Sequence, residues 1–148
     1  MKKKNLMKSL TALVLSVLMV LSLAACGAKP SDGGKDEDKD GYTVAIIKQM
    51  DHASLDEIAD AIAARLDAIA QEQNVSIRYT ITSGQGDQSV LKQLADQAVA
   101  DKVDAIIPIA TTAAQVSAVA TEDSRTPVVY AAISDPDTAK LTGIDYVT

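Results

Sequence analysis

Hydrophobic and polar positions in residues 43–148 follow two alternating periods. A short β-branched run at 43–48 predicts a buried strand. From Ser54 onward, apolar residues recur at the spacing of a helical stripe, and Ser54 with Glu57 matches a capping box that would start this helix. Apolar residues then occupy the odd positions of 75–81, which predicts a second strand.

The same alternation continues to the end of the chain. In order, the pattern predicts a helix capped by Asp87, a strand at 103–110, a helix capped by Thr111 or Thr112, a strand at 127–133 and a candidate fifth strand at 142–147. Regular alternation of strand and helix predicts an α/β fold, a flavodoxin-like open parallel sheet of order 2-1-3-4-5 with helices on both faces. Pro108 is unfavourable in the third strand because proline has no N–H to donate to the hydrogen bonds of the sheet.

The N-terminus follows a different pattern. Four lysines at positions 2, 3, 4 and 8 precede a mostly apolar stretch, 10–23, and small residues then lead to Cys26. This is the order of a secretory signal over residues 1–25. The stretch is shorter than the ~20 apolar residues of a membrane-spanning helix.

Leu23-Ala24-Ala25-Cys26 resembles the lipobox of bacterial lipoproteins. In that family the signal is cut before the cysteine, whose thiol carries a diacylglyceryl group. The resemblance implies a protein anchored by acyl chains to the extracytoplasmic face of the cell membrane. The alternative is an ordinary signal that happens to contain a cysteine.

Composition narrows the classes of function. Without the four signal lysines, 10 Lys and Arg face 20 Asp and Glu, a net charge of −10, which argues against a nucleic-acid partner. One histidine and one cysteine exclude a zinc ligand set and a disulfide framework, and no cofactor motif is present. Residues 26–42 hold the lipidated cysteine and an acidic segment almost without apolar side chains, which predicts a solvated tether before a domain at 43–148.

A ligand in such a sheet binds outside the carboxyl ends of the strands, at the switch point. Two loops flank this point, 48–54 and 110–112, and the second begins a helix whose free N–H groups suit a carboxylate. His52 either contacts a ligand or lies in a solvated loop. Ser134-Asp135-Pro136 follows the fourth strand at the same edge, as a ligand contact or as an ordinary turn.

The sequence gives little support for a set of catalytic residues. The single histidine would have to find a serine and an acid in its crevice, and G-x-S-x-G is absent, so we expect no enzyme. Gly84-Gln85-Gly86 follows the second strand rather than the first and lacks the third glycine of a dinucleotide loop, which favours a turn.

Several segments together resemble the tryptophan/tyrosine-type substrate-binding lipoproteins of ABC transporters. The segments are 44–56, 84–89, 101–104, 109–115 and 133–136, in consistent order. The resemblance implies a type I periplasmic-binding-protein fold, in which two lobes close on a small ligand, often an amino acid and in some members an aromatic one, for delivery to a membrane permease. The ligand-binding positions that it implies are Gln49, His52, Ala110, Thr111, Thr112, Ser134, Asp135 and Pro136.

The departure from this family is length. Its members continue into a second lobe, so we expect 43–148 to be the N-terminal substrate-binding lobe of a truncated chain. An exported, lipid-anchored sensor or adaptor lobe that binds a partner protein is the alternative.

Overall fold

Strands and helices alternate along residues 41–148, the part of the chain that the computed structural model describes. The regular elements are β1 (Tyr42–Lys48), α2 (Ala53–Gln73), β2 (Ile77–Ser83), α3 (Gln88–Ala100), β3 (Ala105–Ile109) and α4 (Thr111–Ala120). The expected signal segment 1–25, the lipidation site Cys26 and the tether as far as residue 40 lie outside the described residues.

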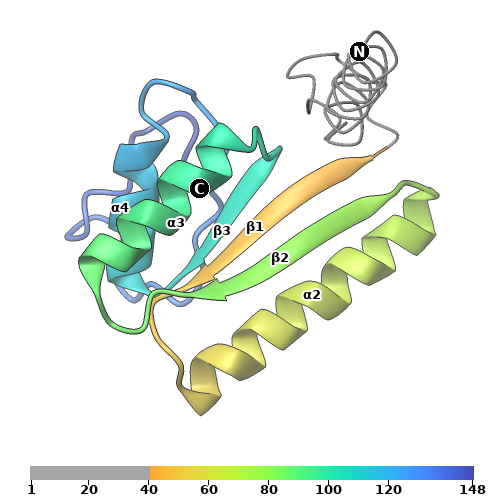
Figure 1. Ribbon diagram of the computed structural model, residues 1–148, viewed down its shortest axis with the longest axis horizontal. Helices are drawn as coiled ribbons and strands as arrows, with labels where there is room; N and C mark the ends of the chain where they lie inside the picture. Colours follow the sequence, from red (N-terminus) through yellow and green to blue (C-terminus); the bar gives the residue numbers. More distant parts are fainter. Residues whose placement is uncertain (1–40) are drawn as a thin grey trace, which may run out of the picture. The chain divides into compact units, whose positions relative to one another are not determined.

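All three strands are parallel and lie in the order β2-β1-β3. Helix α2 covers one face of the sheet, and α3 and α4 cover the other (Figure 1). This arrangement confirms the expected open parallel sheet with helices on both faces. None of the described helices combines the length and the apolar character needed to cross a bilayer.

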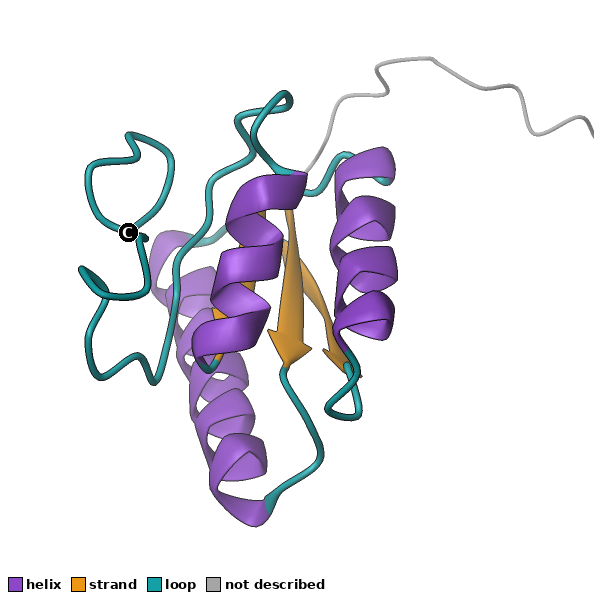
Figure 2. Cartoon of the chain, turned by 90° about the vertical axis from the view of Figure 1, so that its left-hand side faces the viewer, coloured by secondary structure: helices purple, strands orange, loops and turns teal. Residues whose placement is uncertain are grey.

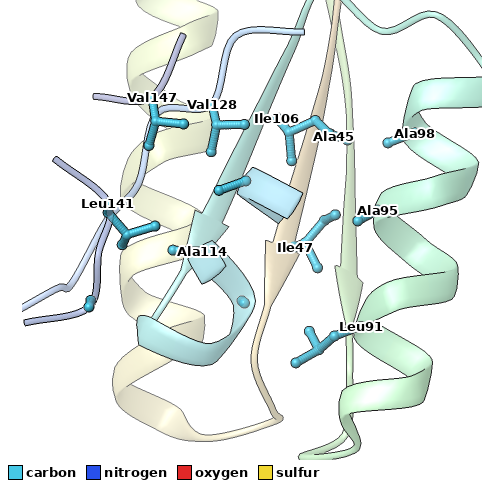
Figure 3. Close-up of a cluster of buried hydrophobic side chains, with 13 residues drawn as sticks. Ala45, Ile47, Leu91, Ala95, Ala98, Ile106, Ala114, Val128, Leu141 and Val147 are labelled. Atoms are coloured by element: carbon cyan, nitrogen blue, oxygen red, sulfur yellow. The ribbon is translucent and has the colours of Figure 1, made fainter. Parts of the chain in front are cut away.

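The central strand β1 is buried on both faces. Val44 and Ile46 pack toward α2, in a cluster that includes Ala59 and Ile109. The alternate residues of β1 join a larger cluster beneath α3 and α4, where Ile47 and Leu91 are each about 1% exposed (Figure 3). Burial on both sides explains why the strand appears in the sequence as a continuous apolar run.

The expected fourth strand at 127–133 is wrong as a regular element. Only Val128 and Ala131 form bridges with β3, although their register is the parallel one expected. On either side of the gap between these two bridges, the Ile106 N–H donates to the Pro127 carbonyl at 2.9 Å and the Ala131 N–H donates to the Pro108 carbonyl at 2.9 Å. Pro108 has no N–H to donate between these two bonds, so the ladder breaks there.

The candidate fifth strand at 142–147 is likewise reduced to one bridge, between Val147 and Val128. The Val128 N–H donates to the Tyr146 carbonyl at 2.7 Å, and the Thr148 N–H donates back to the Val128 carbonyl at 2.8 Å. The chain therefore runs in the expected order beside β3, without regular strands at these two positions.

Two of the three predicted helix starts are also wrong. The N-cap of α2 is His52, whose ring nitrogen Nδ1 accepts from the Ser54 N–H at 3.2 Å, so Ser54 lies inside the first turn and is not the cap. Asp87 caps α3 as predicted, accepting from the Ser89 and Val90 N–H groups. The N-cap of α4 is Ala110, which offers no side-chain bond, rather than either threonine.

Candidate ligand site at the carboxyl edge of the sheet

The loops that follow the three strands meet at one edge of the sheet. Figure 2 shows the chain leaving the arrowheads into loops at this edge. The Gln49 N–H donates to the Ile109 carbonyl at 3.1 Å, and the Gly86 N–H donates to the Gln49 carbonyl at 2.9 Å. The loop after β1 is therefore bonded to the end of β3 and to the loop after β2.

Gln49 also reaches the first turn of α4 with its side chain. Its Oε1 accepts from the Thr112 N–H at 3.2 Å, across 63 positions of sequence. This bond replaces the cap that Ala110 cannot supply. Gln49 and Thr112, two of the predicted site residues, are thus in direct contact.

The backbone at Ala110 is strained. Its φ of 80° and ψ of 160° fall in a region that is used almost only by glycine. Two bonds hold this conformation: the Ala110 N–H donates to the Ala131 carbonyl at 3.0 Å, and the Ala110 carbonyl accepts from the Ala114 N–H at 3.1 Å. Strain of this kind is retained where the surrounding structure enforces it, and it is frequent at binding sites.

Replacing Ala110 by glycine should raise the free energy of unfolding by about 1 kcal/mol, because relief of strain exceeds the extra freedom of glycine in the unfolded chain. Urea denaturation measures the change. The matched control is Ala64→Gly on the exposed side of α2, where the same substitution should lower stability by about 1 kcal/mol. A loss of stability at both positions would contradict the strain at Ala110.

His52 ends the loop after β1. Its Nδ1 accepts from the Ser54 N–H, so the proton of the neutral ring sits on Nε2. The side chain is exposed and presents this N–H as a donor. His52 therefore lies in an exposed loop with one ring nitrogen capping α2, and its contact with a ligand stays a prediction.

Asp135 takes part in a turn of its own. Its carboxylate accepts from the Thr138 N–H at 3.0 Å and from the Thr138 hydroxyl at 2.6 Å, and these two bonds hold the pKa of the carboxyl below its usual value. The Pro136 carbonyl accepts from the Leu141 N–H. Ser134 is exposed. This segment follows Ala131, which is bonded to Ala110, but the hydrogen bonds of the Asp135 carboxylate lie within its own turn.

An ion-pair cluster at the same edge was missed by sequence reasoning. Lys48 ends β1 and donates through Nζ to Asp51 at 3.1 Å and also to Asp56. The two carboxylates raise the pKa of Lys48, and Lys48, with help from Ser83, lowers the pKa of Asp51. The available signal was a lysine closing an apolar strand, with acids three and eight residues later.

Three cavities of the described domain lie elsewhere. One of about 560 Å³ lies between α3 and α4, one of about 600 Å³ lies between α3 and the sheet, and one of about 770 Å³ lies between α4 and the segment 139–146. None of the three is lined by the loops after β1 and β3. An open edge of a sheet does not enclose a cavity. The polar side chains at this edge and the backbone strain at Ala110 therefore locate the candidate site better than cavity volume does. Within residues 41–148, no cluster of His, Cys, Asp and Glu is arranged to hold a metal ion.

Fold and edge together are those of a periplasmic-binding-protein lobe, and comparison with known proteins agrees. The family model described as ABC transporter substrate binding protein matches residues 43–144. The chain belongs to this family. Because it is a family of solute-binding proteins, the expectation that the chain is not an enzyme is confirmed.

Solved structures extend the comparison. An ABC domain from Streptococcus pneumonia in complex with L-Trp is 35% identical, with a TM-score of 0.59 over 68% of this chain and 33% of that one. A substrate binding protein with adhesive properties from Clostridium difficile, in its ligand-free, open form, is 26% identical, with a TM-score of 0.59 over 69% and 34%. A leucine binding protein from Thermotoga maritima, 18% identical with a TM-score of 0.56 over 72% and 31%, shows the shared fold alone.

The chain spans about a third of the length of these solved structures. Comparison with curated proteins gave no match.

Proposed function

We propose that this chain is the ligand-binding lobe of a lipid-anchored, extracytoplasmic substrate-binding protein, which captures an amino acid and delivers it to an ABC permease. The observation that carries the proposal is the meeting of the strand-end loops at one edge, with Gln49 bonded to Thr112 and Ile109. Ligands of open α/β sheets bind at this edge. The relative solved with L-Trp supports an amino acid, and an aromatic one, as the ligand class.

The α-carboxylate of the ligand would lie at the N-terminus of α4. The partial positive charge of the helix and its first-turn N–H groups, apart from that of Thr112, which is bonded to Gln49, favour an anion there, and the hydroxyls of Thr111 and Thr112 add donors. The His52 Nε2–H supplies a further donor from the loop after β1. Ala110, Ser134, Asp135 and Pro136 complete the proposed ligand face.

Cys26 would carry the acyl chains, and the acidic tether would hold the lobe away from the bilayer. Mass spectrometry of the protein purified from membranes tests this: the expected product begins at Cys26 with a diacylglyceryl group. A mature chain with a free Cys26 thiol would contradict the anchor.

Calorimetry tests the binding proposal. L-tryptophan and tryptamine, which lacks the carboxylate, are titrated into this chain and into a version extended to the length of the relatives. We expect L-tryptophan to bind the extended version at least about 100-fold more tightly, because closure of two lobes buries most of the ligand surface. Tryptamine should bind neither. Equal affinity for both compounds would contradict the carboxylate site, and equal affinity of both versions would contradict closure.

A further inference from the structure

We propose that Lys48 is a positioning residue for the ligand site: its ammonium group fastens the loop 49–52 to the first turn of α2, so that Gln49 and His52 keep their places at the edge. This inference rests on the proposed function, because the edge matters only if it binds a ligand.

Lys48 joins three parts of the fold with one side chain. It is the last residue of β1, and its Nζ donates to Asp51 in the loop and to Asp56 in the first turn of α2. The contacts close a ring around residues 49–52. Ser83, which ends β2, also helps to lower the pKa of the Asp51 carboxyl.

The environment of Lys48 distinguishes it from the surface pairs. The Lys48 side chain is 13% exposed, whereas Lys92 in the Lys92–Asp96 pair on α3 is 64% exposed; the carboxylate partners are similarly exposed in both cases. Water and salt screen a sheltered ammonium less, so its attraction for the two carboxylates is stronger than that of an exposed pair.

The backbone of Lys48 is held independently of its side chain. It pairs with Ser83 and Ile109 in the sheet, and its carbonyl accepts from the Gly84 N–H at 2.9 Å. Replacing the charged end should therefore leave the sheet in place and release the loop. Without the ammonium, the carboxylates of Asp51 and Asp56 repel each other, which moves the loop away from the bond between Gln49 and Thr112.

Hydrogen exchange of the 148-residue chain tests the positioning role. Lys48→Met keeps the apolar stem, and Lys92→Met is the matched control that removes one lysine and one ion pair away from the edge. We expect the amides of Thr112 and Gly86 to exchange roughly fivefold faster in Lys48→Met and at the wild-type rate in Lys92→Met. Lys48→Arg should restore most of the protection, and Asp51→Asn should give a smaller acceleration at the same two amides.

A merely structural role predicts a different result. If Lys48 only supports the fold, the amide of Ile106, which donates to Pro127 beside the core, will accelerate by the same factor as that of Thr112. That outcome, or unchanged exchange at Thr112, would overturn the proposal.

Titration with L-tryptophan separates this proposal from the proposed function. If the extended version does not bind L-tryptophan, the proposed function is refuted, while exchange at Thr112 still decides whether Lys48 positions the loop. If the wild type binds, Lys48→Met should weaken the affinity roughly fivefold and Lys92→Met should not. Unchanged affinity in Lys48→Met despite faster exchange would also overturn the role of Lys48.

Discussion

Ile46→Ala lowers the free energy of unfolding by about 3 kcal/mol, the largest stability effect that we expect in this domain. Ile46 is 0% exposed in the central strand, paired with Ile81 on one side and Ile107 on the other. The alanine leaves a cavity between β1 and α2 that the sheet cannot close without shifting its register. Urea denaturation measures the loss as a lower midpoint with an unchanged slope.

The control removes apolar atoms from a surface position. Val119 on α4 is 69% exposed, so Val119→Ala should change stability by less than about 0.5 kcal/mol. A loss at Ile46 below about 1 kcal/mol would mean that β1 is not the centre of the core.

In the extended version, Thr111→Glu should lower the affinity for L-tryptophan at least about tenfold. Thr111 is the first residue of α4 and is exposed, so the longer side chain fits without displacing the core. A carboxylate here repels the ligand's carboxylate. The same charge suits a helix N-terminus, so stability should stay level or rise by about 0.5 kcal/mol.

Thr111→Gln is the matched control, because it has the same size without the charge. It should keep affinity within about threefold of wild type, since the backbone donors of the first turn remain. Calorimetry and thermal unfolding of the two variants give both quantities. Equal affinity of the glutamate and glutamine variants would show that no ligand carboxylate lies at this terminus.

The sheet could be predicted because its central strands are determined by burial. Residues 44–47 are apolar and buried on both faces, so the prediction of β1 was right to within one residue. The edge that holds the loops followed from parallel topology, which places all strand ends on one side. Contact between Gln49 and Thr112 agrees with this placement.

Other features depend on contacts that local patterns do not contain. The cap of α4 comes from Gln49, in a different loop, and no pattern around Thr111 encodes it. His52 caps α2 because its Nδ1 reaches the Ser54 N–H. The capping-box pattern that favoured Ser54 takes account of residue types alone and not of this contact. The break opposite Pro108 was visible in the sequence as a missing donor, but its consequence fell on the neighbouring segment, 127–131.

We expect the loops that follow the strands to form the ligand face. Amide chemical shifts of the 148-residue chain, recorded by NMR during titration with millimolar L-tryptophan, test it most directly. We expect saturable shifts at residues 49–52, 110–112, Ser134 and Asp135, and no such shifts with tryptamine. Shifts confined to the groove between α3 and α4, around Lys92 and Val119, or no shifts at the edge, would contradict it.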